Sequence, residues 1–202
     1  MKECVLIEMK AISKKFQEHK VLNKFNLRVI SGEILAIMGA SGIGKTTLLR
    51  IMAQLEPPDE GEIRYDASVF EGIEIPFPFV FQDATTLVPW CTVTENIKLV
   101  KPKISEDELN HFLEAVALED HCDKPLSELS GGMKQRVGLA RALVCSSKLI
   151  FMDEPFASLD SPLKQNLYQM IRTLQQKYDL TIIFVTHDDK EAEALATRVI
   201  RL

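Results

Sequence analysis

A glycine-rich stretch between an apolar run and a helix-forming run constrains the fold of this chain more than any other feature. Residues 39–47 read GASGIGKTT and follow the apolar residues 34–38. Glycine permits backbone conformations that a Cβ atom forbids, so the N–H groups of successive residues can converge on one anion. A buried strand, this turn and a helix are together the context of a phosphate-binding P-loop. The stretch therefore predicts an α/β fold with a P-loop core.

Two side chains of this stretch have predicted roles of their own. The Lys45 ammonium adds a full charge beside the outer phosphates, next to the positive end of the helix that starts there. The Thr46 hydroxyl is placed to bind Mg²⁺, which binds through few protein oxygens and keeps several waters. The alternative is a glycine-rich turn that only joins strand to helix. The residues predicted to bind nucleotide here are Gly39, Ala40, Ser41, Gly42, Ile43, Gly44, Lys45, Thr46 and Thr47.

The composition is that of an ordinary globular protein. Apolar residues make up 46% of the 202 residues and charged residues 26%. A net charge of −5 argues against non-specific binding to nucleic acid. No apolar stretch approaches the ~20 residues that cross a bilayer, and the N-terminus lacks a signal-peptide pattern. Reduced thiols in a cytosolic protein are expected for the isolated cysteines Cys4, Cys91, Cys122 and Cys145.

Polar side chains follow three further predicted strands. Gln82 ends an aromatic run, Asp153 and Glu154 end an apolar run, and His187 directly follows another. The carboxyl ends of parallel strands line the nucleotide crevice in such folds. There Gln82 could reach Mg²⁺ or the attacking water, Asp153 could hold Mg²⁺, and Glu154 could deprotonate the water. His187 is predicted to contact the γ-phosphate. The alternatives are an amide without a role, a strand that runs into an acidic turn, and a structural histidine.

Residues 3–30 predict antiparallel strands. Phe25, Leu27 and Val29 alternate with polar residues at the period of two that suits half-buried strands. Phe16 lies in this segment. The residues of the segment alone favour an aromatic side chain of a strand, packed in a small core.

Helix-start signals dominate after about residue 83. Thr92 with Glu95, and Ser105 with Glu108, match the capping box, in which each side chain bonds the backbone N–H of the other residue. These helices are predicted to have a structural role rather than a catalytic one.

Residues 129–136 read LSGGMKQR and form a second candidate anion site. Ser130 is a good helix N-cap, and Gly131 and Gly132 leave the N-terminus of the helix uncovered. Such an N-terminus can bind an anion. A plain helix cap with a flexible entrance explains these residues equally well.

In this order, the stretches resemble the motifs of the ATP-binding subunit of an ABC transporter, and the resemblance covers essentially the whole chain. The family fold implies one ABC ATPase domain over residues 1–202. Its parts are a P-loop NTPase core with a mainly parallel sheet (1–90 and 148–202), an N-terminal antiparallel β subdomain, and an inserted α-helical subdomain (about 91–147). The matching motifs are the P-loop at 39–47, the Q-loop at Gln82, the signature at 129–135, the acidic strand end at Asp153 and Glu154, the D-loop at 158–160 and the switch His187.

The resemblance implies a reaction and its cofactors. The expected reaction is hydrolysis of ATP to ADP and phosphate, coupled to transport, with Glu154 as the base and with His187 and Gln82 also catalytic. Phe16 becomes the aromatic side chain that stacks on adenine. Many relatives have Tyr there, so a hydroxyl contact would be missing. Mg²⁺ is expected at Thr46, Gln82 and Asp153.

The resemblance also implies a second ATP-binding subunit. In this family two subunits pack head to tail, and each ATP lies between the P-loop of one chain and the signature of the other. Ser130, Gly131 and Gly132 would then bind a γ-phosphate held by the partner's Lys45. Asp160 of the D-loop is expected at the nucleotide as well. A homodimer is the expected state.

The expected partners beyond the dimer are transmembrane permease subunits and, indirectly, a substrate-binding protein, which places the chain at the cytoplasmic face of the membrane. Residues 87–97 read LVPWCTVTENI. This run is similar to importers of nitrate, aliphatic sulfonates, taurine and thiamine precursors. Trp90 would lie near the groove that faces the permease, beside Gln82. The alternative is that Pro89 and Trp90 only pack the loop onto the helical subdomain.

Three other functions are considered. They are the ATPase of an exporter, an ABC-type ATPase that does not transport, and a nucleotide-binding partner that does not hydrolyse. The absence of a coiled-coil insertion, of paired metal-binding cysteines and of a second cassette argues against the second, and Glu154 and His187 argue against the third. Relatives commonly continue beyond a strand like residues 198–202, so no C-terminal regulatory domain is expected.

Overall fold

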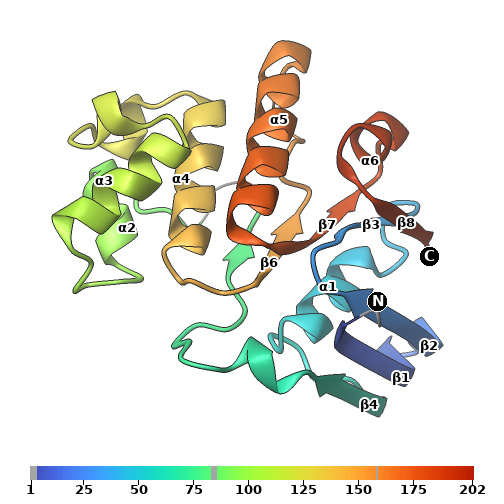
Figure 1. The fold of residues 1–202 in the computed structure, drawn as a ribbon. Helices are drawn as coiled ribbons and strands as arrows, with labels where there is room; N and C mark the ends of the chain where they lie inside the picture. Colours follow the sequence, from blue (N-terminus) through green and yellow to red (C-terminus); the bar gives the residue numbers. More distant parts are fainter. Residues whose placement is uncertain (1–3, 83–85, 158) are drawn as a thin grey trace.

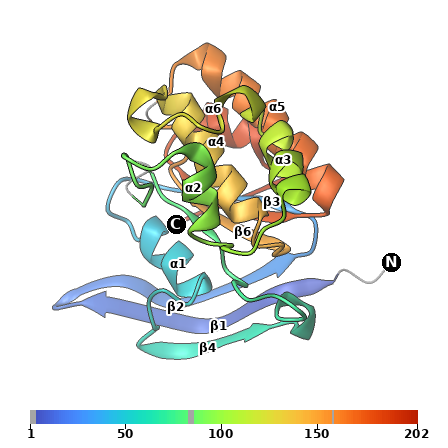
Figure 2. The same ribbon diagram turned by 90° about the vertical axis from the view of Figure 1, so that its left-hand side faces the viewer.

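The computed structural model describes residues 4–82, 86–157 and 159–202. They form two β-sheets, with helices packed between and beside them (Figures 1 and 2). The mixed α/β fold predicted from the P-loop is confirmed.

The first sheet is antiparallel and has the strand order β2–β1–β4. Leu27 and Val29 of β2 are buried, while the polar residues that alternate with them, Asn26 and Arg28, are exposed. The alternation in the sequence therefore marks the side of the strand that packs on the core, and the predicted antiparallel subdomain is confirmed. The strands are β1 (Val5–Phe16), β2 (His19–Ile30) and β4 (Glu60–Tyr65).

The second sheet is parallel and has the strand order β5–β6–β7–β3–β8. All residues of β3, β6 and β7 are buried, as in parallel sheets that are covered on both faces. The aromatic run that ends at Gln82 pairs with β6 only at Phe79 and Val80. Pro78 just before them has no N–H to donate, although its carbonyl accepts from Phe151 N–H at 3.0 Å. The strands are β3 (Ile34–Met38), β5 (Phe79–Val80), β6 (Leu149–Asp153), β7 (Thr181–Thr186) and β8 (Arg198–Arg201).

Helices cover both faces of the parallel sheet. Helix α1 (Lys45–Met52) lies between the two sheets, as Figure 2 shows, whereas α4 (Gly131–Leu143), α5 (Ser161–Tyr178) and α6 (Asp189–Leu195) lie on the other side (Figure 1). Leu35 and Ile37 of β3 join the apolar cluster of α1, and Ala36 and Met38 join the cluster of α4, α5 and α6. The strand that leads into the P-loop is therefore packed on both faces.

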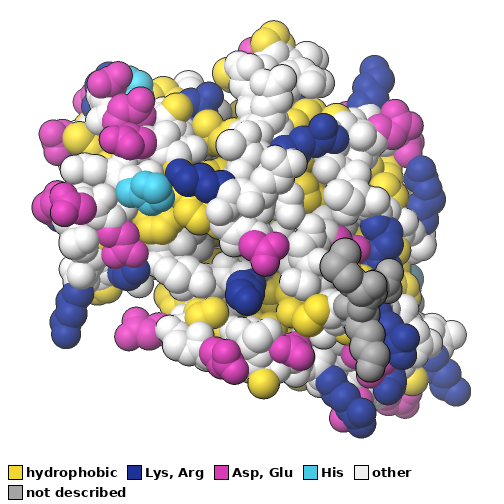
Figure 3. Space-filling view, viewed as in Figure 1, with side chains coloured by type: hydrophobic (Ala, Val, Ile, Leu, Met, Phe, Trp, Pro, Cys, Tyr) yellow, Lys and Arg dark blue, Asp and Glu magenta, His cyan; other side chains and the backbone are white. Residues whose placement is uncertain are grey.

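The segment between the β5 and β6 strands is mostly helical, with α2 (Val93–Lys98), α3 (Glu106–Ala115) and α4. The capping box at Thr92 and Glu95 is confirmed by reciprocal bonds of 3.1 and 2.8 Å. Ser105 caps α3, as its hydroxyl accepts from the N–H of Glu108. The prediction of a full capping box is wrong here, because the Glu108 carboxylate pairs with Lys101 at 2.6 Å instead of with the backbone of Ser105. Acidic side chains gather over α3 (Figure 3), and those in its first turn face the positive end of the helix. Short 3₁₀ turns span η1 (Ala67–Val69), η2 (Glu119–His121) and η3 (Leu126–Glu128).

Two expectations from composition can be compared with the described residues. No helix among them is both long and apolar enough to cross a membrane. Their cysteines are unpaired thiols, as expected from the spacing: Cys4, Cys91, Cys122 and Cys145.

Candidate active site

The carboxyl ends of three neighbouring strands bring the predicted catalytic stretches together. In the parallel register Met38 of β3 pairs with Thr186 of β7, and Asp153 of β6 pairs with Val185. The P-loop, Glu154 and His187 each follow directly after one of these strands. Three stretches far apart in sequence therefore meet at one edge of the sheet, the place where ligands bind in open parallel sheets.

The P-loop is built so that only glycine fits at its last turn. Gly44 has a φ of 113°, and a Cβ atom there would lie 2.3 Å from Cγ1 of Val21 in β2. The next residue, Lys45, is buried, and its Nζ donates to the carbonyls of Gly39 and Ala40 at 3.0 Å each. The lysine charge is thus held within the loop, at the N-terminus of α1, where both favour an anion.

Thr46 and Asp153 contact each other across the site. The Thr46 hydroxyl donates to Oδ1 of Asp153 at 2.9 Å. Burial raises the pKa of Asp153, and the bond from Thr46 opposes this rise. The pair offers hard oxygen donors of the kind Mg²⁺ takes. Within the described ranges no cluster of three His, Cys, Asp or Glu residues could hold a metal. The two oxygen donors of Thr46 and Asp153 fit a cation such as Mg²⁺, which takes its other ligands from water and phosphate.

Glu154 and His187 form the second contact between strand ends. Nδ1 of His187 lies 3.3 Å from Oε2 of Glu154, whose side chain is only 22% exposed, against 62% for the imidazole. Glu154 has a φ of 44°, uncommon for a residue with a side chain, and its N–H donates to the Val185 carbonyl at 3.2 Å. A carboxylate beside an exposed imidazole can accept a proton from a water that approaches from solvent.

Gln82 follows β5, which pairs with β6, and its side chain is exposed. Its backbone carbonyl accepts a hydrogen bond from Nε2 of Gln135 at 3.0 Å. Gln135 is 5% exposed and belongs to α4, so the Q-loop is tied to the signature helix. Gln135 was inside the signature stretch but had no predicted role of its own, because nothing in the sequence shows which backbone group it meets.

Phe16 lies at the end of β1, opposite His19, and is 47% exposed. The interpretation of Phe16 as an aromatic side chain of a small core, which the residues alone favour, is therefore wrong. Nζ of the buried Lys14 lies 5.5 Å from the centre of the Phe16 ring and pairs with Glu56 at 2.7 Å. The β1–β2 hairpin that carries Phe16 also supplies Val21, which touches the P-loop at Gly44. An exposed ring is therefore presented by the hairpin beside the loop.

The signature residues lie at the start of α4, and no hydrogen bond or salt bridge of the described residues joins Ser130, Gly131 or Gly132 to the P-loop. Ser130 is confirmed as the N-cap and accepts from Met133 N–H at 3.3 Å. Gly131 is exposed, but Gly132 is buried, and a Cβ atom there would lie 3.5 Å from Leu163. The expectation that both glycines are uncovered is therefore wrong for Gly132, because α5 packs against it.

Asp160 serves as the N-cap of α5, since its carboxylate accepts from Leu163 N–H at 3.0 Å. The D-loop begins with Ser158, which lies outside the described residues.

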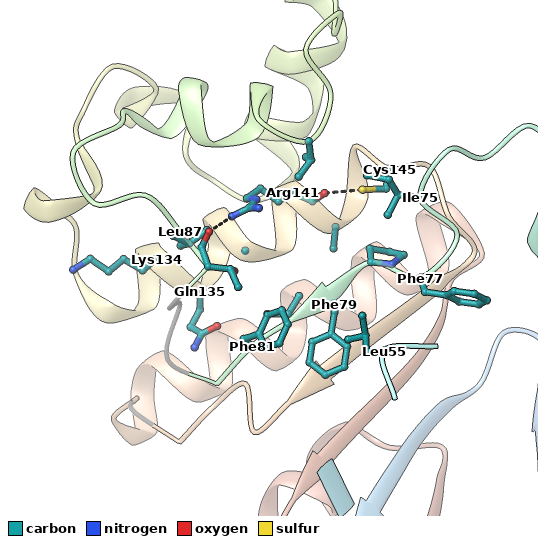
Figure 4. Close-up of a pocket in the computed structure, with 16 residues that line it drawn as sticks. Leu55, Ile75, Phe77, Phe79, Phe81, Leu87, Lys134, Gln135, Arg141 and Cys145 are labelled. Atoms are coloured by element: carbon teal, nitrogen blue, oxygen red, sulfur yellow. Dashed lines mark hydrogen bonds between the residues drawn. The ribbon is translucent and has the colours of Figure 1, made fainter. Parts of the chain in front are cut away.

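A groove of about 200 Å³ lies between the β5 region and α4 (Figure 4). Phe79, Phe81 and Leu87 line it, and Nη1 of Arg141 donates to the Thr86 carbonyl at 2.7 Å. The groove is mainly apolar, with a few polar groups at its edge.

The loop that leads from this groove to α2 carries Trp90. The indole is 80% exposed, so the alternative in which Trp90 packs the loop is wrong. The loop is held instead by the buried Asn96, whose amide bonds the backbone of Val88 and Thr92.

Comparisons with known proteins agree with these observations. The family model described as ABC transporter matches residues 22–157. An aliphatic sulfonates import ATP-binding protein of Agrobacterium fabrum is 39% identical over 96% of this chain and 74% of the relative. A sulfate/thiosulfate import ATP-binding protein of Pectobacterium atrosepticum is 39% identical over 96% of this chain, which spans only 62% of that relative.

A solved structure gives the same result for the fold. The cbiO1 protein of Clostridium perfringens, described as part of the ABC transporter complex cbiONQ, has a TM-score of 0.87 and 26% identity, over 98% of this chain and 85% of that chain. The chain therefore belongs to the ABC transporter family, and its P-loop fold is that of the family's ATP-binding ATPase domain.

Proposed function

We propose that this chain is the ATP-hydrolysing subunit of an ABC importer, working at the cytoplasmic face of a membrane. One observation carries the hydrolytic part of the proposal. The strand ends bring the P-loop lysine, the Thr46–Asp153 pair and the Glu154–His187 pair to one edge of the sheet. The names of relatives that import sulfonates and sulfate support the transport part.

Each residue has a separate task in the proposed reaction. The backbone of residues 39–47 and Lys45 bind the phosphates of ATP, and Phe16 stacks on the adenine. Thr46 and Asp153 would hold Mg²⁺, with Gln82 at the edge, and the bound ion would supply positive charge to the phosphate oxygens. Glu154 accepts the proton of the attacking water. His187, next to Glu154, orients the water and the γ-phosphate.

A second copy of the chain completes the site. Among the described residues no hydrogen bond or salt bridge joins the start of α4 to the P-loop of the same chain, and in a head-to-tail homodimer this helix N-terminus would face the P-loop of the second chain. Ser130, Gly131 and Asp160 would then lie opposite the ATP of the partner chain, while Gly132 lets α4 and α5 pack closely.

The apolar groove beside Gln82 is proposed to receive the permease subunits. Gln135 of α4 lines the groove and donates a hydrogen bond to the Gln82 carbonyl. A movement of α4 would therefore displace the backbone at Gln82. The exposed Trp90 lies on the loop that leaves the groove and offers apolar surface to the same partner. The cargo itself would be recognised by the permease and a substrate-binding protein, with an anion such as a sulfonate as the first candidate.

The hydrolytic proposal is tested with Glu154→Gln, which keeps the shape of the side chain and removes its basic carboxylate. Hydrolysis should fall by about 10²–10⁴-fold, the usual contribution of a general base. Binding of a fluorescent ATP analogue should persist. An exposed residue of α3, Glu114→Gln, is the matched control and should hydrolyse at the original rate. Equal rates for the original chain and Glu154→Gln would refute the assignment of the base.

Transport is tested with the chain assembled with its permease in liposomes. Stimulation of hydrolysis by a binding protein loaded with sulfonate, and not by the unloaded protein, would support an importer of that cargo. If no loaded binding protein changes the rate of hydrolysis, the result would argue against import.

A further inference from the structure

A buried polar network lies directly behind His187. Glu191 of α6 is 4% exposed, and Thr186, the last residue of β7, is 1% exposed. The Thr186 hydroxyl donates to Oε2 of Glu191 at 2.5 Å, and Nζ of Lys164 donates to Oε1 at 2.5 Å. Both carboxylate oxygens are thus satisfied inside the protein, which a buried charge requires.

The network holds the backbone on both sides of His187. Thr186 comes directly before it, and the Thr186 hydroxyl oxygen also accepts the N–H of Asp188, directly after it, at 3.1 Å. The imidazole itself is exposed and reaches Glu154 at 3.3 Å. Thr186 therefore clamps the turn that carries His187, and Glu191 fixes the hydroxyl of Thr186.

The network also reaches the helix that follows the D-loop. Lys164 lies in the first turn of α5, and its N–H donates to the carbonyl of Asp160, the N-cap of that helix, at 3.0 Å. The carboxylate of Glu191 thus joins the end of β7 to the start of α5.

A buried tyrosine lies close to the network. Tyr168 of α5 is 5% exposed, and its pKa is raised by burial and then by the nearby charges of Glu191 and Asp188. Its ring packs edge-on against the ring of Phe156, with the ring centres 4.8 Å apart. Phe156 comes two residues after Glu154 in the chain. The contact between Thr186 and Glu191 is therefore buried, and a hydrogen bond in such a place is stronger than one in water.

We infer that Glu191 is a positioning residue for ATP hydrolysis, which acts through the Thr186 hydroxyl to hold His187 against Glu154 and to link this turn with the start of α5. The inference rests on the role of His187 in the proposed function. Glu191 does not touch the substrate, so its removal should slow the chemical step and leave ATP binding intact.

The first test uses Thr186→Val, which keeps the shape of the side chain but loses the hydroxyl, and Glu191→Gln, which loses the charge. Each should lower kcat about 10–100-fold, the range expected when a catalytic group shifts by a fraction of an ångström to an ångström. The KM for ATP and the Kd of a fluorescent ATP analogue should stay within about twofold of the original. Thr186→Ser should restore kcat. Glu193→Gln, on the exposed side of α6, is the matched control.

A second test separates positioning from a merely structural role. His187→Ala is measured alone and combined with Thr186→Val. If Thr186 acts through His187, the combined variant should be no slower than His187→Ala, since groups that act as a unit give non-additive losses.

Several results would overturn the inference. The first is an unchanged kcat in a folded Thr186→Val protein. The second is a lower kcat that comes with weaker ATP binding and a lower melting temperature. The third is a combined variant whose loss of kcat is the product of the losses of the two single variants. If His187→Ala itself hydrolyses ATP at the original rate, the proposed role of His187 fails, and the inference fails with it. A slow His187→Ala beside a normal Thr186→Val refutes only the inference.

Discussion

The P-loop and the start of α4 are both glycine-containing N-termini of helices, yet their surroundings differ. Around the P-loop, Lys45 is bonded to the loop, Thr46 to Asp153, and Glu154 lies beside His187. At the start of α4, Ser130 accepts from the N–H of Met133 in its own helix, and Gly131 and Gly132 face the apolar side chains of Leu159 and Leu163. The P-loop thus gathers charged and catalytic side chains, whereas the start of α4 is capped by Ser130 and packed by leucines, a contrast that the proposed head-to-tail dimer would explain.

Mixing two inactive variants is the strongest test of whether the P-loop and the start of α4 act on the same ATP from different chains. Lys45→Ala damages the P-loop half, and Gly131→Asp places a negative charge in the α4 half. Each alone should lose nearly all hydrolysis. Random pairing leaves one intact site in half of the dimers, so an equal mixture should recover about a quarter of the original activity in a head-to-tail dimer. No recovery in a mixture shown to contain mixed dimers would mean that each site is complete within one chain.

The Gly131→Asp variant has a built-in control for folding. Gly131 is exposed, and an acidic residue in the first turn of a helix is stabilised by the helix dipole. Its melting temperature should therefore equal or exceed that of the original chain, which assigns the loss of activity to the site.

Dilution tests whether hydrolysis depends on dimerisation, without any substitution. If sites form only on dimerisation and monomers dominate, tenfold dilution should lower the activity per chain about tenfold. The measurement is the rate of phosphate release over a range of protein concentrations at saturating ATP. A constant activity per chain down to nanomolar protein would contradict a shared site.

Metal dependence tests the P-loop half by itself. Thr46→Val keeps the shape of the side chain and removes the hydroxyl that bonds Asp153. The Mg²⁺ concentration for half-maximal hydrolysis should rise about 10–100-fold, as on loss of a metal-site group. Chelation of Mg²⁺ should stop hydrolysis by the original chain. An unchanged Mg²⁺ requirement in the variant would show that the Thr46 hydroxyl is not a ligand.

The smallest expected effect concerns Asp160, which caps α5 and is also proposed to face the ATP of the partner chain. Asp160→Ala should lower the free energy of unfolding by about 1 kcal/mol, whereas Asp160→Asn should keep the cap. Urea unfolding measures the first effect. If Asp160→Asn is as stable as the original chain but hydrolyses more slowly, the carboxylate has a role beyond the cap, and equal rates would leave it only the cap.

Local sequence patterns predicted the elements that depend on neighbours in the chain. The capping box at Thr92 and Glu95, the N-cap Ser130 and the buried strands before Glu154 and His187 all form as expected. The second box failed at Glu108, because Lys101 from outside the helix competes for its carboxylate. Patterns that need only a few consecutive residues were reliable, and those open to a competing charge were not.

The P-loop, the acidic strand end and the histidine strand end can be predicted from the chain alone, because each is a local arrangement of residue types. Which of these groups meet depends on the packing of the folded chain. The parallel register sets His187 against Glu154 and Thr46 against Asp153, and packing alone buries Glu191 behind Thr186 and covers Gly132 with Leu163. These contacts join residues from different elements, and their distances are set by the packing of strands and helices rather than by order along the chain.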